Sequence, residues 1–198
     1  MKKYLIAFIA FDIIFAVFII STLNQMVNLD EETKSKWSQV LNNYQRRADL
    51  IPNLVETVKG FAAHEKDTLT QVTEARAKAT QTKISIDDLS NVEAMQKFTQ
   101  NQGELSAALS RLMVVVEKYP ELKSDENFLL LQNSLEGTEN RIAVARRDYI
   151  EAIKEFNIKI RTIPTKWVVA LFSDLEPKAT FEIDESATHA PQVDFSEK

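Results

Sequence analysis

The amino-acid sequence predicts an all-α protein in which one transmembrane helix precedes an antiparallel helical bundle of three long helices and a short fourth. The 198 residues include only three glycines and five prolines, whereas strand-rich folds need frequent turn residues. A long apolar run lies near the amino terminus. The remaining segments repeat apolar residues in alternating steps of three and four, which is the coiled-coil-like spacing of helices that pack against one another.

Residues 4–23 form an almost unbroken apolar run behind a short tail, residues 1–3. Twenty helical residues span about 30 Å, the thickness of a bilayer's hydrocarbon core, so the run predicts a transmembrane anchor. A cleaved signal peptide is the alternative. Its apolar region would be shorter and would end at a small-residue cleavage site, which residues 19–23 do not offer. We therefore expect a single-pass protein of the cell membrane.

Asp12 lies near the middle of this apolar run. A central aspartate costs about 3 kcal/mol on insertion, and the surrounding Leu, Ile, Phe and Val side chains outweigh that cost. Asp12 is then either a tolerated, protonated residue or a contact with another transmembrane helix, which marks a partner or an oligomer. Lys2 and Lys3 precede the run and Lys34 and Lys36 follow it, so the charge count does not decide on which side the bundle lies.

The bundle predicted at residues 24–173 begins with a helix over residues 37–79. Its apolar positions keep the same helical phase across Pro52 and Gly60, which favours a kinked but continuous helix. The alternative is that the chain reverses near Gly60. A continuous helix leaves the Trp167 segment far from the bilayer, whereas a reversal returns it to the membrane, where Trp167 lies at the lipid headgroups.

Two further long helices and a short one complete the predicted bundle. The second helix begins near residues 90–93, which have the capping-box pattern Ser-Asn-Val-Glu, and it ends at Pro120. The third opens with Asp125 and Glu126, whose charges suit a helix N-terminus. Because the connection is short, the second and third helices are expected to be antiparallel. Residues 167–172 then form a short apolar segment.

The carboxyl-terminal residues 174–198 contain two prolines and seven acidic residues against two basic ones. This composition predicts an irregular, solvated tail. Three of its apolar residues, Phe181, Val193 and Phe195, are able to dock on the bundle.

Two similar charged clusters occur in the predicted first and third long helices. They consist of Arg46, Arg47 and Asp49, and of Arg146, Arg147 and Asp148. Each adjoins an alanine at a packing position, so the first interpretation is that these charges pair between closely packed helices. The alternative is a basic patch that grips lipid phosphates or an acidic partner. Together with Asp12 and Trp167, these residues are the candidate interaction site.

The sequence shows no recognisable catalytic, metal-binding or cofactor-binding motif. His64 lacks the second histidine four residues later that a zinc-protease helix requires, and neither His64 nor His189 follows a glutamate by three residues, as in di-iron bundles. The net charge of −5 argues against general nucleic-acid binding. We therefore expect no enzyme activity, no cofactor and no small-molecule substrate; an enzyme with an unrecognised site is the least favoured alternative.

Several stretches of the sequence are similar to the LemA family: residues 45–55 (QRRADLIPNLV), 58–66 (VKGFAAHEK), 116–123 (VEKYPELK), 139–149 (ENRIAVARRDY) and 190–195 (APQVDF). The resemblance covers essentially everything after the anchor. It implies a bacterial-type membrane protein with one span, an amino terminus outside and an antiparallel helical bundle in the cytoplasm. It implies no catalytic residues, and it links the chain to relatives that take part in membrane-compartment formation.

The function expected from these features is a membrane-tethered scaffold or interaction module that contacts membrane lipid and a protein partner or a second copy of itself. The alternative is a membrane-remodelling or lipid-binding protein that uses the bundle and the Trp167 segment.

Overall fold

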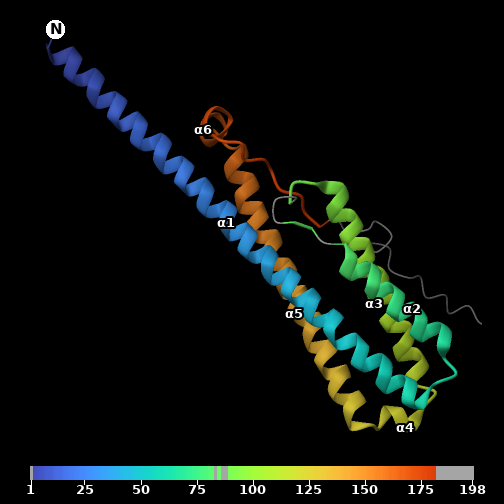
Figure 1. Cartoon of the computed structure of the whole chain (residues 1–198). Helices are drawn as coiled ribbons and strands as arrows, with labels where there is room; N and C mark the ends of the chain where they lie inside the picture. Colours follow the sequence, from blue (N-terminus) through green and yellow to red (C-terminus); the bar gives the residue numbers. More distant parts are fainter. Residues whose placement is uncertain (1, 83, 86–88, 182–198) are drawn as a thin grey trace, which may run out of the picture.

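A computed structural model describes residues 2–82, 84–85 and 89–181, which form six helices and no strands (Figure 1). The helices are α1 (Lys2–Phe61), α2 (Lys66–Gln81), α3 (Val92–Val116), α4 (Pro120–Lys123), α5 (Glu126–Arg161) and α6 (Thr165–Phe172). The predicted all-α fold is confirmed.

The longest helix, α1, runs from Lys2 to Phe61 without a break, so the apolar residues 4–23 continue directly into the bundle. Its amino-terminal part projects beyond the bundle (Figure 1). The apolar window there has a mean hydropathy of 2.6, and 6% of it is buried. By length and composition this part of α1 is a candidate for crossing a membrane.

The single helix predicted over residues 37–79 is wrong, because α1 ends at Phe61 and the chain reverses into α2. The backbone N–H of Ala62 donates to the carbonyl of Val58 at 2.8 Å and closes the last turn. Val58 in α1 and Val72 in α2 are both fully buried in one apolar cluster. The unbroken helical spacing of the apolar residues therefore indicates that both segments pack into the same core. It does not distinguish one long helix from a helical hairpin.

Pro52 lies inside α1, and the helix continues through it. Proline has no N–H to donate to the carbonyl four residues earlier, which belongs to Ala48. The Nε of Arg76 in α2 donates to this carbonyl at 2.7 Å. The Ala48 carbonyl, which Pro52 leaves without its helical donor, thus accepts a hydrogen bond that connects α2 to α1.

Side-chain caps define where α3 and α5 begin. Asn91 accepts a hydrogen bond from the backbone N–H of Ala94 at 3.0 Å, one residue beyond the predicted cap at Ser90. Asp125 accepts one from the N–H of Phe128 at 2.9 Å, where the third long helix was predicted to open.

The long helices pack along α1. Figure 1 shows α5 antiparallel to α1 and the α2–α3 hairpin against the half of this pair farther from the projecting end. Among the residues that the structure describes, buried apolar side chains form three clusters along this length. The cluster nearest the projecting end joins Met26 of α1, Phe156 of α5 and Val169 of α6.

Candidate membrane-proximal site

The short helix α6 packs where the apolar segment of α1 ends. Its inner face buries Val168 and Val169, which are 7% and 4% exposed. Val169 shares a cluster with Met26, three residues beyond Leu23. The prediction that the Trp167 segment lies far from the anchor is therefore wrong. The chain reverses after α1, so α5 runs back along α1 and brings α6 to the end of the apolar segment.

The outer face of α6 and the turn before it carry large apolar side chains that the structure leaves exposed. Ile163 is 63% exposed, Trp167 60%, Leu171 76% and Phe172 57%. Trp167 and Leu171 are spaced by four residues and so lie one above the other on α6, whereas Ile163 belongs to the turn before the helix. Of these four, the sequence predicted only Trp167 as a candidate; the four-residue spacing was the signal for Leu171. Exposed apolar patches of this kind mark interaction surfaces.

A buried ion cluster lies on α1 just beyond the apolar segment. The Asp30 carboxylate lies 2.8 Å from Nζ of Lys34 and 2.9 Å from Nζ of Lys178. Burial raises the pKa of Asp30, but the two lysines outweigh burial and hold the pKa below its ordinary value of 3.8. Asn157 of α5 also exchanges two hydrogen bonds with the backbone of Lys178, at 2.9 and 3.0 Å. The cluster fastens residues 174–181 to α1 and α5.

Replacing Asp30 with asparagine is expected to lower the melting temperature of the full-length protein in detergent at neutral pH. The pKa of Asp30 is lower in the folded than in the unfolded chain, so the carboxylate stabilises the fold above the unfolded pKa, and this stabilisation is lost as the pH falls through the folded pKa. The melting curves of the two proteins should therefore converge below the ordinary pKa of 3.8. Circular dichroism across this range checks it. A gap that stays constant with pH would contradict the role, and Asp174→Asn, at an exposed site, is the matched control.

The tail is irregular over residues 174–181, as predicted, but it is not all solvated. Phe181 is 7% exposed and packs against Trp37 and Tyr149, with ring centroids 5.9 and 5.6 Å apart. The predicted docking of Phe181 is confirmed. Val193 and Phe195 lie outside the described residues. Burial also raises the pKa of the Tyr149 hydroxyl.

Arg47, from the first charged cluster, is buried inside the bundle and is 1% exposed. Its guanidinium pairs with Glu139 of α5 at 2.6 Å. It also donates to Oε1 of Gln102 at 2.6 Å and to Oγ of Ser106 at 2.9 Å, both on α3. The arginine thus joins α1, α3 and α5, which fits the interpretation of a contact between packed helices.

The other two members of this cluster face outward on α1. Arg46 and Asp49 are both exposed. The Nε2 of Gln45, on the same helix, donates a hydrogen bond to the Asp49 carboxylate at 2.7 Å. Arg46 is therefore placed to contact something outside the bundle, whereas Arg47 is not.

In the second cluster, on α5, Arg146 stacks over the ring of Phe181 at 4.4 Å. Arg147 is exposed and lies 3.8 Å from the carboxylate of its neighbour Asp148. Within the described part of the chain, no ion pair joins the first cluster to the second. The structure therefore does not bring the two clusters together into one site.

Asp12 lies on the projecting part of α1 and is exposed. Eighteen residues, or about five turns of 3.6 residues, separate it from Asp30, so both lie on the same face of this helix. At Asp30 that face is covered by the tail. At the level of Asp12 the described chain leaves it open.

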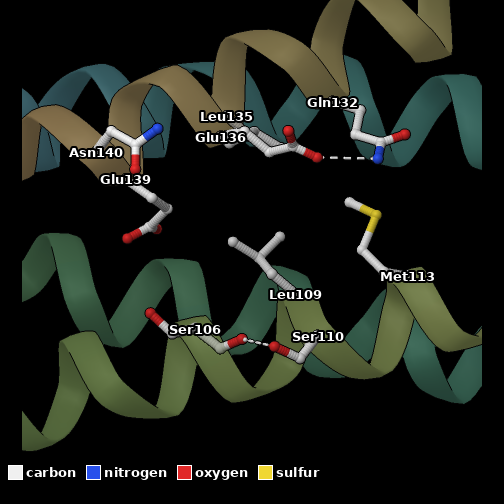
Figure 2. Close-up of a pocket in the computed structure, with 9 residues that line it drawn as sticks. All are labelled: Ser106, Leu109, Ser110, Met113, Gln132, Leu135, Glu136, Glu139 and Asn140. Atoms are coloured by element: carbon white, nitrogen blue, oxygen red, sulfur yellow. Dashed lines mark hydrogen bonds between the residues drawn. The ribbon is translucent and has the colours of Figure 1, made fainter.

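A groove of about 480 Å³ lies between α3 and α5 (Figure 2). Leu109 and Met113 of α3 line one side of it, and polar side chains lie beside them. Ser110 donates to a backbone carbonyl one turn back at 3.0 Å, and Gln132 donates to Glu136 at 3.0 Å. Within residues 2–82, 84–85 and 89–181, no group of three or more His, Cys, Asp or Glu side chains is placed to hold a metal ion.

The fold and this site define a class of all-α protein. An apolar helix projects from a helical bundle, and the bundle places a second apolar surface, the outer face of α6, beside the end of the apolar segment. The chain belongs to the LemA family, whose family model matches residues 36–195.

Curated relatives are similar over most of the chain. Magnetosome proteins MamQ 1 and MamQ 2 of Paramagnetospirillum magneticum (strain AMB-1) are each 30% identical over 160 residues, which cover 73% of this chain and 57% of the relative. Protein LemA of Metamycoplasma hominis is 26% identical over 162 residues, which cover 82% of this chain and 69% of the relative. The chain thus spans little more than half the length of the MamQ proteins. Together with the apolar segment of α1, these relationships indicate a membrane-associated protein.

Proposed function

We propose that the protein is a single-pass, membrane-tethered scaffold without enzymatic activity, which presents its helical bundle to a protein partner or to a second copy of itself. The observation that carries the proposal is the continuity of α1 from residue 2 to residue 61. Because the anchor and the bundle share one helix, the surfaces of the bundle keep a fixed height above the membrane. A rigid arrangement of this kind suits a protein that positions other molecules.

Asp12 supports a contact within the membrane. A carboxyl group in hydrocarbon is costly unless it faces a polar partner, and such residues commonly mark helix–helix contacts. Asp12 lies on the face of α1 that carries Asp30, so a partner helix approaches from the side of α1 on which the tail and α6 pack.

Asp12→Leu is expected to reduce the association of the full-length protein in mild detergent, because it removes the polar contact while it favours insertion. Chemical cross-linking in membranes, followed by mass measurement of the solubilised complex, checks this. Glu151→Leu removes a carboxylate from an exposed site in the bundle and serves as the control. Unchanged cross-linked species in Asp12→Leu would remove the role of Asp12, and a wild-type protein that is purely monomeric would count against the scaffold itself.

A second function, direct lipid binding or membrane remodelling, is favoured by one observation: the exposed apolar face of α6 lies at the end of the candidate span. Liposome binding by the chain that lacks the anchor, residues 1–23, compared between wild type and variants of α6, tests it. Absence of binding at any ionic strength would reject it.

A further inference from the structure

The outer face of α6 is apolar although its inner face already fills the core. Val168 and Val169 pack inward, while Trp167, Leu171 and Phe172 remain more than half exposed. Amphipathic surface helices normally place polar residues on the outer side. A helix that is apolar on both sides needs a second apolar environment.

The position of α6 indicates which environment that is. Its inner face contacts the cluster that contains Met26, so α6 lies level with the end of the apolar residues 4–23. A bilayer that contains residues 4–23 has its boundary at this height. In Figure 1 α6 is seen nearly along its own axis while α1 lies across the page, so α6 runs crosswise to α1. A helix crosswise to a membrane span lies along the membrane surface.

Charged residues border this apolar face. Arg161 and Lys166 are exposed, and Lys159 is half-buried, on the last turn of α5 and the start of α6. Cations at this depth bind lipid phosphates. Asp174 and Glu176 follow the helix and offset part of the positive charge. The surface is therefore suited to a bilayer through its apolar area rather than through net charge.

We infer that α6 is a second membrane contact, in which Trp167, Leu171 and Phe172 enter the headgroup region of the bilayer that α1 crosses. This inference rests on the proposed membrane tether. Tryptophan is enriched at this depth because its ring is apolar and its N–H is polar. Since α1 already holds α6 at the surface, the contact is intramolecular in effect and needs little intrinsic affinity. With two points of attachment the bundle is fixed in tilt and rotation, and not only in position.

The test measures the fluorescence of Trp167 in the full chain reconstituted into phosphatidylcholine vesicles. The chain has two tryptophans, so Trp37→Phe leaves Trp167 as the sole reporter. Lipids brominated on their acyl chains quench a tryptophan that they contact. The expected result is a loss of Trp167 emission in brominated vesicles, relative to unbrominated ones, together with protection from acrylamide in the water. Vesicles that also contain phosphatidylglycerol should give the same result.

Two variants serve as controls. Trp167→Phe leaves only Trp37, which is fully buried and lies fourteen residues, or about 21 Å, beyond Leu23. Its emission should not respond to brominated lipid. Leu171→Asp, added to Trp37→Phe, should reduce the quenching of Trp167 while far-UV circular dichroism shows unchanged helix content. Undiminished quenching in this variant would overturn the assignment of the contact to this face.

Other outcomes would overturn the inference in distinguishable ways. Quenching of Trp167 by acrylamide and not by brominated lipid would show that α6 faces water. Protection from both quenchers would show that protein, such as a second copy, covers it. An alkaline carbonate wash separates these results from failure of the tether: protein that leaves the vesicles refutes the tether and the α6 contact together. Protein that stays, with Trp167 unquenched by lipid, refutes the α6 contact alone.

Discussion

Replacing Trp37 with alanine is expected to lower the free energy of unfolding by about 4 kcal/mol, in the range found when large aromatic residues are truncated in a core. Trp37 is fully buried, and its ring lies 5.5 Å from that of Phe98, 5.0 Å from that of Tyr149 and 5.9 Å from that of Phe181. These rings come from α3, α5 and the tail. The truncation therefore opens a cavity where three separate segments meet on α1.

Urea denaturation of the full-length protein in detergent, followed by circular dichroism, measures this loss. Trp37→Phe is the matched control, and it should cost about 1 kcal/mol because it keeps a ring in place. It also removes the indole N–H, which is buried without a hydrogen-bond partner in the described part of the chain. Equal stabilities for the alanine and phenylalanine variants would show that the ring does not support this core.

Replacing Glu139 with leucine is expected to lower the free energy of unfolding by about 3 kcal/mol. Removal of one member of a buried ion pair leaves an uncompensated charge inside the protein. Here the remaining charge is the guanidinium of Arg47, which is 1% exposed and keeps only neutral partners on α3. Because the Glu139 side chain is itself 45% exposed, water compensates part of the loss, and the value lies at the low end of the range for buried pairs.

The double variant Arg47→Met with Glu139→Leu should recover much of this stability, since an apolar pair of similar size leaves no buried charge. Glu117→Leu is the surface control. Glu117 lies 2.6 Å from Lys123, the same separation as in the buried pair, but both side chains are more than half exposed, so no measurable change is expected. A double variant as unstable as Glu139→Leu alone would refute the charge argument.

Much of the fold could be predicted because it depends on local patterns. The apolar run, the scarcity of glycine and proline, and the capping residues act within one helix, so the helical class and the start of α5 at Asp125 follow from the sequence. The reversal after Phe61 could not be predicted in this way. Buried residues in a continuous helix and in a hairpin share the same spacing when both arms face one core, as Val58 and Val72 do.

The candidate site was predicted in part for the same reason. Trp167 is recognisable as an unusual apolar residue near the end of the chain, and Arg47 as a charge beside a packing position. Trp167 is 60% exposed and Arg47 is 1% exposed. This difference depends on packing partners that are far away in the sequence. Asp30 and Lys34 are one helical turn apart, so their contact follows a local pattern. No local pattern predicts the contact of Asp30 with Lys178, which lies in the tail.

The amino-acid sequence alone is enough to predict that this protein is helical, that its amino-terminal helix is long and apolar enough to cross a bilayer, and that it belongs with the LemA family. The packing of the helices is needed to show where the chain reverses, which arginine is internal, and that α6 returns to the end of the apolar segment. The difference lies in how far along the chain each interaction reaches. Helix formation depends on neighbours within a few residues. Burial of a side chain depends on which segment, often distant in the sequence, packs over it and excludes water.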